Sequence, residues 1–207
     1  MTEKEKQTAA IIVEPRPPLA IIRLNRPAQR NPLSINTLAE LDAAISALTV
    51  RPDISAIIFT GAGDVFASGA NIRELQAHTP ATAREFAARG QSLFQKIADA
   101  RQLTIATVNG YCMGGGLDLA LACDLRCAAT DAVFAHPGAR LGITTGWGGT
   151  QRLPRLIGTA RAIEMFVTAR QVTAREAYEI GLVNLLSESV LDAACELARN
   201  YLARQEG

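Results

Sequence analysis

Asp118 stands two residues after three consecutive glycines, Gly114 to Gly116, in a chain of 207 residues. The apolar, β-branched stretch 103–108 before the glycines predicts a buried strand, and the apolar stretch 117–123 after them predicts a buried helix. Glycines at such a junction let the backbone approach a ligand and leave N–H groups pointing outward, where the helix dipole favours negative charge. The pattern therefore predicts an anion-stabilising turn with a carboxylate beside it. A tight turn with Asp118 as a favourable N-terminal charge fits this stretch equally well.

The elements that would position this turn alternate along the chain. Strands are predicted by apolar runs at 10–14, 19–24, 54–59, 103–108, 124–128, 132–135 and 183–186. Helices are predicted after Ser34 and over 81–100, 117–123, 150–158, 161–168 and 173–180, with a final helix capped by Ser187 or Ser189. The three prolines between the first two strands predict a long loop, and residues 60–75 read as a loop of small residues. This alternation predicts an α/β domain whose ligand lies where the strands end in glycine loops.

Composition narrows the class of protein. Apolar residues make up 48% and charged residues 20% of the chain, which is ordinary for a globular core. The net charge of +1 and the 5% aromatic content do not indicate a nucleic-acid surface. We expect a flexible N-terminus over 1–9, with neither an export signal nor a membrane span.

The four cysteines form no CxxC pair, and only two histidines, His78 and His136, accompany them. The sequence therefore predicts no metal site, and reduced cysteines in a chain without an export signal predict a cytoplasmic protein.

Five ordered motifs together resemble the crotonase superfamily, the enoyl-CoA hydratase/isomerase family. They are Leu24-Asn25-Arg26-Pro27, Phe66 to Ile72, Val108 to Tyr111 with the triple glycine, Ala122 to Arg126, and Gly146 to Leu153. The resemblance implies a repeated ββα spiral core with short peripheral helices, assembled as a homotrimer or hexamer. It places an acyl-CoA-binding core at 10–190. Residues 191–207 would begin a C-terminal helical region that the sequence leaves incomplete, because family members run further.

The resemblance also implies roles for individual residues. The backbone N–H groups of Ala70 and Gly115 would bind the thioester oxygen, and each such donor is worth roughly 3 kcal/mol when the oxygen becomes an enolate. Asp118 would be the acid–base group. Substrate-binding positions carried over from the family are Arg26, Ala28, Ala67, Ile72, Gly114, Gly138 and Gly146. Arg73 would help to offset the phosphates of coenzyme A.

The sequence departs from the family pattern at one catalytic position. Hydratases of the family hold one water between two glutamates, and here the first is Asp118 while Gly138 replaces the second. Losing one acid–base group commonly costs ~10²–10⁴-fold in rate. His136 lies two residues earlier, on the same face if the segment is extended, so it either supplies the missing function or is a structural histidine.

These observations favour an acyl-CoA enzyme that stabilises a thioester enolate, with enoyl-CoA hydration as the expected reaction. Isomerisation of the double bond and decarboxylation of an acyl-CoA are the alternative reactions, and a non-catalytic acyl-CoA binder is the alternative class. The coenzyme A thioester is the substrate, so no separate cofactor is expected.

Overall fold

The computed structural model describes residues 9–204. The flexible segment expected at 1–9 lies outside this range except for Ala9. A six-stranded sheet in the order β1-β2-β4-β7-β9-β12 forms the centre, parallel throughout except for the β1–β2 hairpin. Its strands are β1 (Ile11–Arg16), β2 (Leu19–Leu24), β4 (Ala56–Gly61), β7 (Leu103–Val108), β9 (Leu125–Ala128) and β12 (Leu185–Leu186). Every residue of β4 is buried, as expected for a parallel strand covered on both faces.

A second, smaller sheet runs beside the first in the order β11-β10-β8-β5, and a short pair joins β3 to β6. These strands are β3 (Pro32–Leu33), β5 (Val65–Ala67), β6 (Gly69–Ala70), β8 (Tyr111–Met113), β10 (Val133–Ala135) and β11 (Val172–Thr173). Each of β4, β7 and β9 leads into a strand of the small sheet and then into a helix. This is a repeated ββα unit, so the expected α/β class and spiral core are confirmed.

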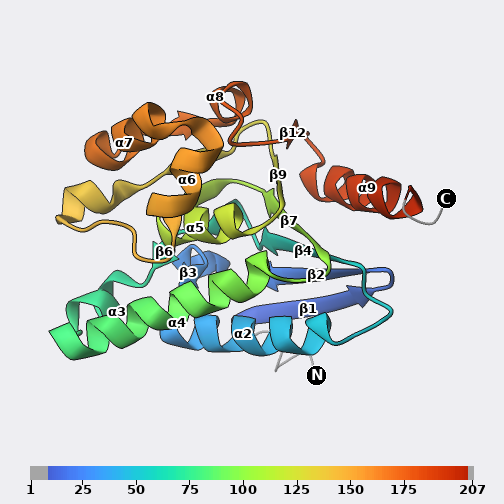
Figure 1. The fold of residues 1–207 in the computed structure, drawn as a ribbon, viewed down its shortest axis with the longest axis horizontal. Coiled ribbons are helices and arrows are strands. Elements are labelled where there is room, and N and C mark those ends of the chain that lie inside the picture. The colour runs from blue at the N-terminus through green and yellow to red at the C-terminus, as the bar shows by residue number, and fades with distance from the viewer. Residues whose placement is uncertain (1–8, 205–207) are drawn as a thin grey trace.

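Helices cover both sides of the sheets. They are η1 (Pro27–Gln29), α2 (Ile35–Thr49), α3 (Ile72–Gln76), α4 (Pro80–Ala98), α5 (Gly115–Ala122), η2 (Pro137–Leu141), α6 (Gly149–Ile157), α7 (Thr159–Thr168), α8 (Ala174–Glu179) and α9 (Val190–Ala203). Figure 1 shows α2 and α4 side by side along one side of the molecule and α6, α7 and α8 on the opposite side. Helix α9 packs against β7, β4 and β9. Within residues 9–204, no helix combines the length and apolarity needed to span a bilayer.

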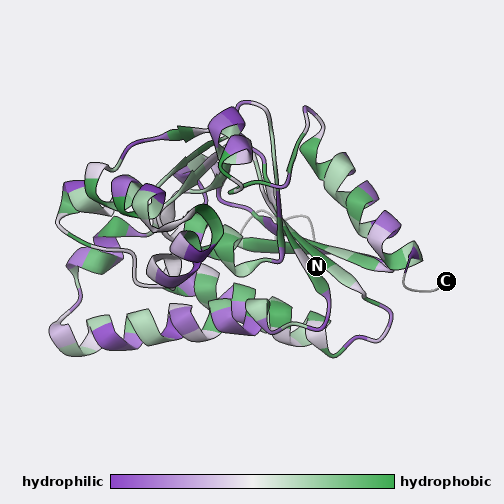
Figure 2. Ribbon diagram, turned by 45° about the horizontal axis from the view of Figure 1, so that its top comes forward, coloured by the Kyte–Doolittle hydropathy of each residue, from purple (hydrophilic) through white to green (hydrophobic). Residues whose placement is uncertain are grey.

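Helix α2 shows how the sequence determines where a helix begins and which of its faces is buried. Ser34 caps it by accepting a hydrogen bond from the backbone N–H of Thr37. Apolar side chains spaced three and four residues apart, such as Leu38, Leu41 and Ile45, are buried against the sheet. Figure 2 shows the same alternation of hydrophobic and hydrophilic positions along the long helices, around strands that are mostly hydrophobic.

Two local predictions were wrong. The β1–β2 hairpin turns through Pro17 and Pro18 alone, because Pro15 and Arg16 belong to β1. Proline is tolerated there since β1 is an edge strand, where one row of N–H groups faces away from the sheet. The loop expected at 60–75 contains β5, β6 and α3. The strands β5 and β6 have two or three residues and lie among glycines and small residues, so no apolar run marks them in the sequence.

Candidate active site

A cavity of about 380 Å³ opens where three loops converge. One loop joins β5 to α3, the second joins β8 to α5, and the third runs from the end of β10 to α6. The wall of the cavity is formed by residues 68–70, 72, 75, 78, 83, 86–87, 114–115, 118, 136–138, 141 and 143–147. The cavity thus collects small residues and large apolar side chains around one buried carboxylate.

The first two loops approach each other at backbone distance. A Cβ built on Gly69, where φ is +95°, would lie 2.8 Å from the carbonyl oxygen of Met113 and 3.0 Å from the nitrogen of Gly115. A Cβ on Gly115 would lie 3.4 Å from the nitrogen of Ala70. Gly115 is the first residue of α5, so its N–H has no acceptor within the helix. Glycine at 69 therefore lets two backbone segments meet at the cavity wall, and glycine at 115 leaves room for the Trp147 ring, which a Cβ would approach to 2.4 Å.

Asp118 lies in the first turn of α5 and is only 1% exposed. Its Oδ2 accepts hydrogen bonds from the hydroxyl of Thr145 and from the backbone N–H of Trp147, the latter at 3.3 Å. Its Oδ1 has no hydrogen-bond partner among residues 9–204. One oxygen of the carboxylate is thus fixed by protein groups, while the other makes no hydrogen bond and lies against Gly149 and the His136 ring.

Burial raises the pKa of Asp118 from 3.8 to about 6. The hydrogen bonds from Thr145 and Trp147 and the positive charge of Arg152 act in the opposite direction. Desolvation is the largest of these effects. A carboxyl group with this pKa can both accept and return a proton near neutral pH.

His136 follows β10 and is 3% exposed, with its ring centroid 5.0 Å from that of Phe166. Its Nε2 lies 3.5 Å from Asp118 Oδ1. Neither ring nitrogen has a hydrogen-bond partner in the described part of the chain. Burial lowers the pKa of His136 from 6.5 to about 4, so the ring is neutral near pH 7.

The position of the missing second acid is closed to any side chain. Gly138 lies in η2, and a Cβ on it would be 2.5 Å from the carbonyl oxygen of Ile143. The backbone N–H of Ile143 donates to the carbonyl oxygen of Gly138 at 3.0 Å, so the loop folds back on itself at this point. A glutamate cannot be added here without moving the loop.

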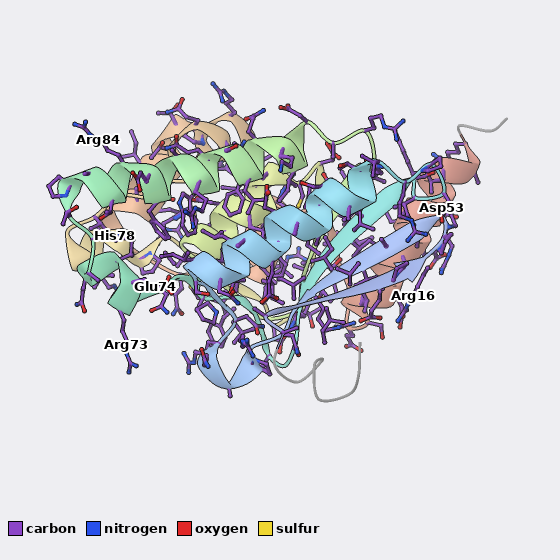
Figure 3. The ribbon with its side chains drawn as sticks, turned by 90° about the horizontal axis from the view of Figure 1, so that it is seen from below. Arg16, Asp53, Arg73, Glu74, His78 and Arg84 are labelled. Atoms are coloured by element: carbon purple, nitrogen blue, oxygen red, sulfur yellow. The ribbon has the colours of Figure 1, made fainter. Side chains whose placement is uncertain are left out.

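The residues predicted to form the site divide into two groups. Seven of the ten line the cavity: Ala70, Ile72, Gly114, Gly115, Asp118, Gly138 and Gly146. Ala67 is fully buried, with its carbonyl and Cβ against Gly116. Arg26 and Ala28 belong to the region of η1 and do not line the cavity. Arg73 lies on α3, and Figure 3 shows its side chain projecting away from the body of the protein.

Sequence reasoning missed two functional groups. Thr145, which holds Asp118, lies 27 residues further along the chain, and no local pattern connects the two. Trp147 falls inside a family motif, but its ring has a role of its own: it packs 5.2 Å from Phe86 and edge-on at 5.6 Å from Phe94, measured between ring centroids. The single tryptophan beside a glycine-rich loop was the available signal.

Comparison with known proteins gives consistent matches. The family described as Enoyl-CoA hydratase/isomerase matches residues 16–206. A crotonyl-CoA hydratase from Syntrophomonas wolfei is 42% identical over 94% of this chain and 76% of its own. A short-chain-enoyl-CoA hydratase from Clostridium acetobutylicum is 37% identical over 93% of this chain and 75% of its own. The crystal structure of an enoyl-CoA hydratase from Bacillus anthracis superposes with a TM-score of 0.88 at 36% identity, covering 92% of this chain and 76% of that one.

Proposed function

The chain belongs to the enoyl-CoA hydratase/isomerase family, and we propose that it adds water to the double bond of short 2-enoyl-CoA thioesters. The observation that carries this proposal is the geometry of Asp118, whose Oδ1 makes no hydrogen bond with residues 9–204 at the wall of a largely apolar cavity. The relatives named as crotonyl-CoA and short-chain-enoyl-CoA hydratases support the same reaction.

Two backbone N–H groups would bind the thioester carbonyl oxygen. When water adds to Cβ, the electrons of the double bond move to that oxygen and an enolate forms. The N–H groups of Ala70 and Gly115 stand close together in the cavity wall, and fixed donors stabilise the enolate without reorganising. Removing one such donor typically costs about 3 kcal/mol of transition-state stabilisation.

Asp118 would remove the proton from the attacking water. Its pKa of about 6 makes it ionised at neutral pH yet basic enough to hold a proton during the reaction. The hydrogen bonds to Oδ2 fix the plane of the carboxylate, so Oδ1 presents its lone pairs in one direction. Thr145 and Trp147 therefore act as positioning residues.

The aromatic wall limits the length of the acyl chain. The Trp147 ring is 4% exposed and packs against Phe86 and Phe94, so it occupies space behind the reacting centre. A cavity of about 380 Å³ that also holds the thioester leaves room for a short chain. We therefore assign short acyl groups as the substrate class.

The direct test is hydration of crotonyl-CoA, followed by loss of the conjugated enoyl absorbance and by chromatography of the 3-hydroxyacyl product. Parallel incubations with a 3-enoyl-CoA and a malonyl-type CoA measure isomerisation and decarboxylation. Asp118→Asn should lower hydration by ~10²–10⁴-fold because the proton acceptor is lost. Asp53→Asn is the matched control, since Asp53 is an exposed carboxylate paired with Arg51 outside the cavity.

Hydration by the wild type that survives unchanged in Asp118→Asn would show that Asp118 is not the acid–base group. Turnover of the 3-enoyl-CoA or malonyl-type substrate without hydration would replace the proposed reaction by one of the alternatives. Tight acyl-CoA binding without any product would instead indicate a non-catalytic binder.

We also propose that the protein works in the cytoplasm as a homotrimer or hexamer and needs no cofactor beyond its coenzyme A substrate. The four cysteines are free and buried, in keeping with a reducing compartment. Exposed apolar side chains on and near α7, such as Ile163 and Val167, are candidates for a subunit contact. Light scattering of the purified protein measures the assembly directly.

A further inference from the structure

His136 and Asp118 lie side by side, but the proposed hydration gives a role only to Asp118. Asp118 Oδ1 and both nitrogens of His136 are buried and have no hydrogen-bond partner among residues 9–204. Both side chains line the same cavity, and Nε2 faces Oδ1 at 3.5 Å. Buried polar atoms in folded proteins are nearly always paired, so three unpaired atoms at one point indicate a place for a polar ligand.

Among residues 9–204 no protein group hydrogen-bonds these atoms, although Gly149 packs against Asp118 Oδ1, where a Cβ on Gly149 would lie only 2.1 Å from it. Thr145 and Trp147 bind the other carboxylate oxygen, and Arg152 contributes only its charge from α6. Phe166 covers one side of the imidazole from α7 without offering a polar atom.

We propose that His136 is the second proton-handling side chain of this site: its Nε2 and Asp118 Oδ1 together hold the attacking water and pass one of its protons to Cα of the acyl group. This inference rests on the proposed hydration and assigns to His136 the function lost at Gly138. It differs from the two-glutamate arrangement of the family because the second group reaches the water from position 136.

The spacing suits one water molecule. Two atoms 3.5 Å apart are too close for a water to fit between them in line. A water oxygen about 2.8 Å from each atom forms a triangle with them and so contacts both. Asp118 and His136 both contribute to the cavity wall, so the cavity is the side from which a water would reach the pair.

The pair takes up one proton and returns one proton during each turnover. As the water oxygen bonds to Cβ, one O–H bond breaks and its proton moves to the pair, whose charge changes from −1 to 0. The double-bond electrons move to the thioester oxygen. The pair then returns one proton to Cα as the enolate collapses and a C–H bond forms, which restores the charge of −1. No oxidant, reductant or further reactant is needed.

The transferred proton can be shared by the two side chains. Burial brings the pKa of Asp118 up to about 6 and that of His136 down to about 4, while their 3.5 Å separation lets a proton pass between them. Such a pair titrates as a unit rather than as two independent groups. His136 therefore serves as both a water ligand and a proton carrier.

The test is a double-mutant cycle with Asp118→Asn, His136→Gln and the double variant, measured by crotonyl-CoA hydration. Glutamine can still hydrogen-bond the water but cannot carry its proton, so we expect His136→Gln to lose ~10²–10⁴-fold in kcat. Because the pair acts as a unit, the double variant should be about as slow as the slower single variant. Phe166→Leu, which alters only an apolar contact of the ring, should keep most of the turnover, and thermal unfolding checks the fold of each variant.

A second readout separates this proposal from the hydration itself. Exchange of the Cα protons of butyryl-CoA in D₂O needs the enolate and the proton-handling pair but no attack by water. Exchange that depends on both Asp118 and His136, in a protein that does not hydrate crotonyl-CoA, would leave the pair intact and overturn only the proposed function. Full activity of His136→Gln in both assays would overturn the pair, as would losses that multiply in the double variant. A wild type inactive in both assays contradicts both proposals.

Nuclear magnetic resonance gives a measurement independent of turnover. The chain has two histidines, so ¹⁵N-labelled side chains give a simple spectrum that His78→Gln assigns. Asp118→Asn should shift the His136 nitrogens, and Asp53→Asn should not. Unmoved His136 nitrogens in Asp118→Asn would show that the two groups do not meet in solution.

Discussion

Thr145→Val should move the acid limb of the hydration profile to higher pH. The Thr145 hydroxyl donates to Asp118 Oδ2 and stabilises the ionised carboxylate against the cost of burial. Valine has a similar shape but no donor, so the charged form loses one hydrogen bond. A hydrogen bond to a charged group is worth about 1.5–3 kcal/mol, which at 1.36 kcal/mol per pKa unit corresponds to about one to two units. The pKa of Asp118 should rise from about 6 to roughly 7–8.

The assay is kcat/KM for crotonyl-CoA between about pH 5 and 9, which reports the ionisation of the free enzyme. With a pKa of about 6, roughly nine tenths of the Asp118 carboxyl groups are ionised at pH 7. With a pKa of 7–8 only about a tenth to a half are ionised, so turnover at pH 7 should fall by about two- to tenfold and recover toward pH 9.

Thr168→Val is the matched control, because its hydroxyl bonds the carbonyl oxygen of Glu164 on the exposed side of α7. An acid limb that stays in place in Thr145→Val would refute the assignment of Thr145 as a group that tunes Asp118. An equal loss at every pH would mean that Thr145 positions the carboxylate without setting its pKa.

Three further perturbations have defined outcomes. Trp147→Ala should raise kcat/KM for longer 2-enoyl-CoA chains relative to crotonyl-CoA, because it empties space beside Phe86. It should also lower the free energy of unfolding by about 3–5 kcal/mol. Unchanged relative rates for the two chain lengths would contradict the role of Trp147 as the pocket wall. Gly149→Ala should reduce hydration, measured as kcat, because its Cβ would collide with Asp118 Oδ1. Asp118→Asn should raise the free energy of unfolding at pH 7 by about 3 kcal/mol in denaturant titrations. The folded pKa of Asp118 lies above its unfolded value of 3.8, so the wild type loses stability as pH rises from about 4 to 6. Because the folded pKa of His136 is lowered from 6.5 to about 4, its contribution to the free energy of unfolding is lost as pH falls from 6.5 to about 4. The Asp118→Asn variant should reveal that slope.

The sequence alone determined the α/β class, the strands of the central sheet and the glycine turn before Asp118. These are local patterns: apolar runs, the three- and four-residue spacing of α2, and glycines where two backbones meet. The same reasoning found the short strands β10 and β12, which lie in apolar runs, but not β5, β6 or β11, whose pairing with distant segments no local apolar run announces.

Only the tertiary structure decided what surrounds Asp118. The sequence left His136 open between an acid–base group and a structural histidine, and folding placed its Nε2 3.5 Å from Oδ1. It also brought Thr145 to the other oxygen and closed the space at Gly138 with the carbonyl group of Ile143. Burial and hydrogen bonding set a carboxyl pKa, and both are sums over residues distant in sequence. The residue types were therefore readable from the chain, whereas their protonation and partners came from packing.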